Sequence, residues 1–145
     1  MDLSSLQRDS AKVEAGEWVG DIPGFGEARL RVRGLESTAF AATRARKERA
    51  VPRNQRERDG TLKSDAARRI FGEALADVIL LDWDGITEGG KTVPYDAERA
   101  ALLLTNPDFS PFADAVVWAA SFVDRARVAD AAEVGNGLPK SSKGR

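Results

Sequence analysis

The segment Val78–Val123 reads VILLDWDGITEGGKTVPYDAERAALLLTNPDFSPFADAVVWAASFV and decides the fold of this chain. It contains two of the three tryptophans, the only tyrosine and three of the six phenylalanines. Its pattern predicts the end of a helix, an acidic turn, a short extended piece and then two capped helices. Because large aromatic side chains dominate small cores, we expect this segment to form the centre of the fold.

The acidic turn Asp82–Gly85 is the first place to look for chemistry. A calcium loop of the EF-hand type requires acids at the first, third and fifth positions and glycine at the sixth, whereas here Gly85 follows the second acid directly. An acid/base pair requires a cleft that shifts the pKa values of both carboxyl groups, and a surface turn supplies none. We therefore expect Asp82 and Asp84 to be solvated while Trp83 points into the core.

Upstream, the stretches 17–22 and 28–35 flank the turn sequence Pro-Gly-Phe-Gly. The second stretch alternates apolar residues with arginines, a period typical of a half-buried strand. A β-hairpin is the natural interpretation, with Trp18 packing across it. Trp18, Trp83 and Tyr95 are the predicted structural anchors.

Four helices are expected. The first helix starts after Ser37, a predicted N-cap, and the second covers 61–79. The third helix follows the predicted N-cap Asp96, and the last helix starts with Pro111 and covers 111–134. The fold class predicted is α+β: an N-terminal β-hairpin or small antiparallel sheet, with Thr92–Tyr95 as a candidate further strand, packed on a bundle of about four helices.

The chain divides by composition into three parts. Residues 1–12 are polar and predicted to be a flexible N-terminus, and 13–133 form a single α+β domain. Within it, 52–60 contains no apolar residue except proline and is expected to be a flexible basic loop. Residues 134–145, rich in Gly, Ser and Lys, are predicted to be a disordered tail.

Two missing residue types restrict the function. The chain has no Cys and no His, so disulfides, thiol nucleophiles, serine triads and HExxH zinc sites are excluded within it. We expect no enzyme activity, no cofactor and no metal site. No apolar run approaches the roughly 18 residues of a membrane helix, and no signal-peptide core is evident, so a cytoplasmic protein without a membrane partner is expected.

The segment Arg44–Arg69 contains ten basic residues against four acids. Phosphate contacts use such clusters, but no aromatic residues alternate with these to stack bases. A solvated helix end and loop is therefore favoured over nucleic-acid binding, and docking to an acidic partner is the third option. The basic patch comprises Arg44, Arg46, Lys47, Arg49, Arg53, Arg56 and Arg58.

The last helix has an apolar stripe wider than a surface helix requires, because Val117 and Trp118 extend it. Trp118 suits either the core or an interface with a partner or with a second copy of the chain in a homo-oligomer. The predicted partner-binding residues are Phe109, Phe112, Val117, Trp118 and Phe122.

Four short motifs together resemble the tail assembly chaperones of long-tailed, siphovirus-like bacteriophages and prophages. The first motif comprises Trp18–Val19, Gly24 and Ala28–Arg33, and the second is Ile79–Thr87. The third comprises Val93–Asp96 and Leu102–Leu103, and the fourth comprises Pro107–Phe109 and Phe112–Val116. The likeness extends from Val13 to about Val128. Gly34 departs from the family pattern, which more often has a small polar residue there, and the loop 52–60 is longer and more basic.

The resemblance implies a non-enzymatic role. Such chaperones coat the tape measure protein and bring tail tube subunits to it during tail morphogenesis in the host cytoplasm, and they are absent from the mature virion. This chain would correspond to the short form, which a ribosomal frameshift extends in many such phages. Two rival classes stay open: a structural virion protein, such as a head–tail connector or tail completion factor, and a small nucleic-acid-binding regulator that uses Arg44–Arg69.

Overall fold

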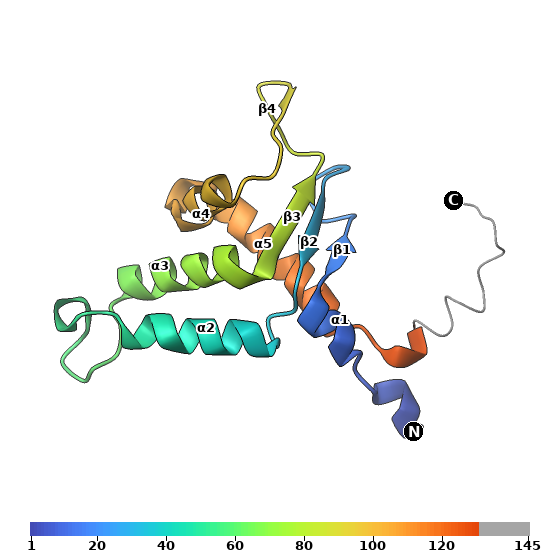
Figure 1. Cartoon of the computed structure of the whole chain (residues 1–145), viewed down its shortest axis with the longest axis horizontal. Helices are drawn as coiled ribbons and strands as arrows, with labels where there is room; N and C mark the ends of the chain where they lie inside the picture. The colour runs from blue at the N-terminus through green and yellow to red at the C-terminus, as the bar shows by residue number, and fades with distance from the viewer. Residues whose placement is uncertain (131–145) are drawn as a thin grey trace.

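The computed structural model describes residues 1–130, and the predicted tail 134–145 lies outside the described residues. The described chain is α+β, which confirms the predicted fold class (Figure 1). In chain order its elements are η1 Leu3–Leu6, α1 Ser10–Ala15, β1 Glu17–Val19, β2 Arg29–Val32, α2 Thr38–Arg49, η2 Arg53–Gln55, α3 Ser64–Ala74, the π-helix η3 Leu75–Ile79, β3 Leu80–Asp84, β4 Thr87–Glu88, β5 Lys91–Thr92, α4 Ala97–Thr105, η4 Pro107–Phe109 and α5 Ser110–Asp124.

The central element is an antiparallel sheet of order β1-β2-β3. Leu30 of β2 is paired with Val19 on one side and with Trp83 on the other, and all three side chains are buried. Helix α5 packs on this sheet, behind it in the view of Figure 1. Helices α2 and α3 lie side by side and extend away from the sheet, and α4 packs against α3.

The third strand corrects the prediction of an acidic turn. Residues 80–84 form β3, and π-helix η3 leads directly into it. Asp82 and Asp84 are paired in register with Arg31 and Arg29, and the carboxylate of Asp84 lies 3.0 Å from the guanidinium of Arg29. Strand pairing therefore explains why two acidic residues occur here, because they lie opposite two arginines on the neighbouring strand. The turn comes one residue later, at Gly85, whose φ of 80° suits glycine.

The predicted Thr92–Tyr95 strand is also different in the structure. Lys91 and Thr92 form β5, which pairs with β4 in a separate two-stranded ribbon and does not join the main sheet. This ribbon projects from the body of the molecule (Figure 1).

The helix caps agree with the sequence. The buried Ser37 accepts a hydrogen bond from the backbone N–H of Phe40 at 3.3 Å, and Asp96 caps α4 through the N–H of Arg99 at 3.1 Å. Each cap satisfies an N–H group that the first helical turn leaves without a partner.

The last helix is shorter than predicted, because α5 ends at Asp124. Beyond it the chain pairs with the N-terminal segment: the N–H of Asp9 donates to Ala126, and the N–H of Val128 donates to Gln7. The carboxylate of Asp124 accepts hydrogen bonds from the N–H groups of Leu35 and Glu36. The carbonyl of Ala126 and the N–H of Val128 therefore bond to the N-terminal segment instead of taking part in a continuing α5.

Two segments that were predicted to be flexible contain hydrogen-bonded structure. The first 12 residues include η1 and the start of α1, and the backbones of Arg8 and Arg127 form an isolated antiparallel β-bridge. The loop 52–60 includes η2, and the backbone of Arg56 forms an isolated antiparallel β-bridge with that of Leu62. The division of the chain into flexible ends and one domain stays a prediction.

Candidate partner-binding groove

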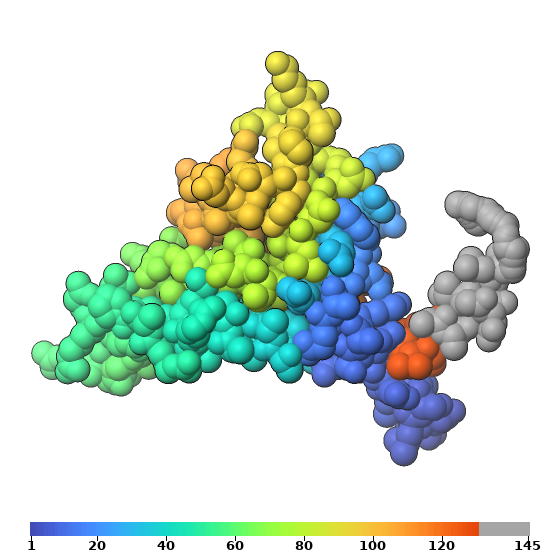
Figure 2. Space-filling view, in the orientation of Figure 1, coloured from blue at the N-terminus to red at the C-terminus, as the bar shows by residue number. Residues whose placement is uncertain are grey.

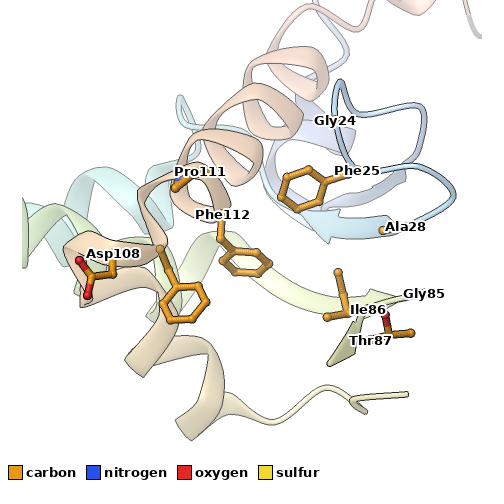
Figure 3. A pocket seen from close by; sticks show the side chains of 10 residues that line it. Gly24, Phe25, Ala28, Gly85, Ile86, Thr87, Asp108, Pro111 and Phe112 are labelled. Atoms are coloured by element: carbon orange, nitrogen blue, oxygen red, sulfur yellow. The ribbon is translucent and has the colours of Figure 1, made fainter. Parts of the chain in front are cut away.

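An apolar hollow lies where the start of α5 meets two turns of the sheet (Figure 3). Its volume is about 380 Å³. It is lined by Gly24, Phe25 and Ala28 from the β1–β2 connection, by Gly85, Ile86 and Thr87 after β3, and by Asp108, Phe109, Pro111 and Phe112 from η4 and α5. Figure 3 shows Phe25, Phe112 and Ile86 around the same space, so three segments distant in sequence build one surface.

A second hollow of about 380 Å³ adjoins the first, and Gly24, Phe25 and Pro111 line both. Its other lining residues are Ile22, Pro23, Asp114, Ala115 and Trp118. We call the residues that line the two hollows the α5 groove. Most of its wall is apolar, which is typical of sites that take an apolar segment or ligand.

An aromatic cluster supports the floor of the groove. Phe112 is 8% exposed, with its ring centroid 6.2 Å from that of Phe25 and 5.8 Å from that of Trp83. The indole of Trp83 meets the ring of Tyr95 edge-on at 5.1 Å and donates from Nε1 to the carbonyl of Val93 at 2.7 Å. Packed rings and a satisfied indole N–H hold the floor in one conformation.

Exposed aromatic side chains lie along and beside the groove. Phe109, 46% exposed, lines the first hollow, and Trp118, which is half-buried, lines the second. Phe122 is 48% exposed and stacks on Trp118, with ring centroids 5.9 Å apart and planes 11° apart. Removal of such rings from water is favourable, so this surface suits an apolar partner.

The predicted partner-binding residues are thus placed unequally. Phe109, Trp118 and Phe122 offer exposed area, whereas Phe112 belongs mainly to the core. Val117 is partly buried against the core and lines neither hollow. Sequence reasoning missed Phe25 and Ile86, although a lone phenylalanine inside the Pro-Gly-Phe-Gly turn was a usable signal for the first.

Two of the three predicted anchors have structural contacts of the expected kind. Trp83 is 5% exposed, and the hydroxyl of Tyr95 donates to the carbonyl of Leu80 at 3.4 Å. Burial, and then the nearby Asp82 and Asp96, raise the pKa of Tyr95. Trp18 instead lies 37% exposed, with the guanidinium of Arg29 4.9 Å from its ring centroid. Trp18 is on the outer face because its neighbour Val19 takes the inner one.

The predicted basic patch is divided between paired and exposed side chains. Arg44 pairs with Glu48, and Lys47 lies 3.0 Å from Asp77 and 3.5 Å from Glu73. Arg56 donates to three backbone carbonyls, those of Glu48, Val51 and Gly60. The remaining arginines of the patch, Arg46, Arg49, Arg53 and Arg58, are exposed and make no ion pair with any residue in 1–130.

A comparison with known protein families identifies the family of this chain. The family model described as YdaY prophage protein matches residues 35–136, which extends from the end of the β1–β2 hairpin through α5. The protein therefore belongs to the YdaY prophage protein family, and its origin is a phage or prophage. Searches of curated proteins and of solved structures returned no match. Within residues 1–130, no helix is both long and apolar enough to span a bilayer.

Proposed function

We propose that this prophage protein is a non-enzymatic tail assembly chaperone. It binds the tape measure protein and recruits tail tube subunits during tail morphogenesis in the host cytoplasm. Membership of a prophage family supports the phage context, and the motif resemblance described above supports the specific role.

The observation that carries the proposal is the aromatic surface at the α5 groove. A long helical client exposes apolar faces before it is packed, and a chaperone must cover them reversibly. Phe109, Trp118 and Phe122 supply exposed ring area, and the two hollows between them and the β1–β2 turn can receive apolar side chains. Amphipathic helices bind apolar grooves through anchors spaced at one helical face, which is the mode proposed here.

The two carboxylates that were considered for acid/base chemistry, those of Asp82 and Asp84, lie apart from the α5 groove. Asp84 pairs with Arg29 at the sheet surface, and Asp82 faces Arg31 across the strands. Neither carboxylate is among the residues that line the α5 groove. The groove therefore presents rings and small side chains, with Asp108 and Asp114 as its carboxylates.

The test is co-expression with a fragment of the tape measure protein encoded by the same prophage. Wild type should keep the fragment soluble and co-purify with it, whereas Trp118→Ala together with Phe122→Ala should lose both effects. Leu102→Ala is the matched control, because Leu102 is an equally apolar, 68% exposed residue on α4. Phe112→Ala is unsuitable, because it would perturb the core.

Client solubility that is unchanged in the double variant would refute the assigned surface. Mass spectrometry of purified particles tests the role itself. A chaperone should be missing from the mature virion, and recovery of the chain in stoichiometric amounts would identify a structural virion protein instead.

A further inference from the structure

The connected ends of α2 and α3 form a second surface, remote from the sheet. Figure 1 shows the two helices extending side by side, with their connection at one end of the molecule, and in Figure 2 no other segment covers this end on the face toward the viewer. It has a small core of its own, made by Val51, Ala66 and Ile70 with Leu62 packed against them. This surface is separate from the α5 groove, because no residue that lines its hollows lines the groove.

The connection between α2 and α3 is cross-linked by hydrogen bonds. The three carbonyl contacts of Arg56 span the end of α2 and the loop that follows. Backbone bonds from Glu57 to Thr61 and from Lys63 to Gln55 close the loop further. A surface built on such a frame is preorganised, so binding does not have to order the loop.

Two adjoining hollows cross this end. The first, of about 520 Å³, is lined by Arg46, Lys47, Ala50, Val51, Pro52, Gln55, Arg69, Ile70 and Glu73. The second, of about 560 Å³, is lined by Asn54, Gln55, Lys63, Asp65, Ala66, Arg68, Arg69 and Thr105. Gln55 and Arg69 line both hollows and are hydrogen-bonded to each other at 2.8 Å. Because they share these two residues, the hollows adjoin each other. We call the residues that line the two hollows the hairpin-end channel.

Positive charge dominates the rim of the channel. Arg46 at the first hollow, and Lys63 and Arg68 at the second, are exposed and without an ion pair in residues 1–130. Arg49, Arg53 and Arg58 add three more exposed cations on the same helix end and loop. The facing carboxylates are Glu73, which already pairs with Lys47 and Arg69, and Asp65, with Glu57 and Asp59 on the loop. Cations at the rim thus outnumber the carboxylates that could neutralise them.

We propose that the hairpin-end channel binds an acidic segment of a partner protein, in which carboxylates are interspersed with small or apolar residues. The planar guanidinium group of arginine can donate two parallel hydrogen bonds to a carboxylate, and its positive charge attracts the negative carboxylate. Such a segment places its neutral residues opposite Glu73 and Asp65 and its methyl groups against the exposed Ala50 and Pro52.

Nucleic acid fits the same surface less well. A phosphate backbone carries a charge at every nucleotide, so it cannot avoid the two carboxylates in the channel wall. No aromatic side chain of residues 1–130 lines either hollow, so the aromatic platform on which single-stranded bases commonly stack is missing there.

The test uses fluorescence anisotropy on the full chain at low salt. The probes are a labelled peptide of alternating Glu and Ala, its Gln–Ala counterpart and a duplex DNA oligonucleotide. Wild type should bind the Glu–Ala peptide and not the Gln–Ala peptide, and added salt should weaken the binding. Arg46→Glu with Arg68→Glu, one change in each hollow, should weaken binding by about tenfold or more, because like charges then face the peptide.

Two further variants keep the result interpretable. Lys91→Glu is the matched control, because it reverses an exposed charge on the distant β5 and should leave the affinity unchanged. Arg46→Gln with Arg68→Gln serves if the reversed pair does not fold, and it should also weaken binding. The proposal is overturned by tighter binding of the DNA than of the peptide. It is equally overturned by no peptide binding at low salt, or by equal losses in Lys91→Glu and the channel variants.

Discussion

Gly34 lies where the end of β2 passes the end of α5, and its replacement by alanine should be unusually costly. An alanine methyl at this position would lie 2.1 Å from Oδ1 of Asp124 and 2.9 Å from Cγ1 of Val13. Both distances are shorter than real contacts, so the carboxylate must move. The departure of Gly34 from the chaperone pattern is thus matched by a specific close contact in this chain.

The displaced carboxylate carries two hydrogen bonds. It accepts from the N–H of Leu35 at 3.0 Å and from the N–H of Glu36 at 3.1 Å. Hydrogen bonds to a charged group contribute about 1.5 to 3 kcal/mol each, with the lower end fitting a partly exposed site. Losing both predicts that Gly34→Ala lowers the free energy of unfolding by about 3 kcal/mol.

Urea unfolding of a double-mutant cycle measures this effect. Asp124→Ala alone removes both hydrogen bonds, and it also removes the nearer of the two obstacles to a methyl group at position 34, leaving only Cγ1 of Val13. Gly34→Ala should therefore cost much less in the Asp124→Ala background than in wild type. Gly20→Ala is the matched control, since its new methyl would be 3.4 Å from the nearest atom, an ordinary contact. Additive costs, or a neutral Gly34→Ala, would refute the reasoning.

Three single contacts elsewhere in the fold should have measurable effects. Hydrogen bonds from the backbone and then the hydroxyl of Thr38 lower the pKa of Glu14. The stability that Glu14 contributes is therefore present above the ordinary glutamate pKa and lost as the pH falls through the folded-state value, so the unfolding free energies of wild type and Glu14→Gln should converge on acidification. Arg56→Met removes three hydrogen bonds to backbone carbonyls, so hydrogen exchange across 50–63 should accelerate about tenfold or more while the sheet stays protected. Trp83→Phe leaves the carbonyl of Val93 without its 2.7 Å donor and should cost about 2 to 3 kcal/mol in thermal unfolding, whereas an unchanged melting temperature would contradict the role of Trp83 as an anchor.

Local signals in the sequence were sufficient for the elements that depend on local contacts. Ser37 and Asp96 were identifiable as caps because a cap bonds to an N–H only three residues ahead. The alternation in 28–35 identified β2 because one face of that strand is buried. These features require no knowledge of the distant parts of the chain.

Long-range pairing accounts for the main error. Strand β3 pairs with β2 across about fifty residues of sequence, and its burial does not alternate strictly, so period alone could not distinguish it from a turn. The arginines of β2 and the acids Asp82 and Asp84 were visible separately. Their significance depends on the register that brings Arg29 opposite Asp84. The same limit applies to Trp18, because choosing the inner face requires knowing that Val19 lies opposite Leu30.

The α5 groove likewise contains some residues that the sequence pattern predicted and others that it did not. The wide stripe of α5 predicted Trp118 and Phe122, because both lie on one regular helix. Phe25 and Ile86 reach the groove from turns whose positions depend on the whole sheet. A binding surface formed by several distant segments is therefore only partly visible in the sequence, even when its helical wall is clear.

The two proposed surfaces differ in what supports them, and this makes them separable by experiment. The α5 groove rests on the sheet and the aromatic cluster around Phe112, so substitutions that loosen the sheet should affect it. The hairpin-end channel rests on the small core around Val51 and on the contacts of Arg56. Because distant sites act additively, charge reversal at Arg46 should leave tape measure binding intact, and Trp118→Ala should leave acidic-peptide binding intact. If either change removed both activities, one surface would serve both partners, and the assignment of two independent sites would be wrong.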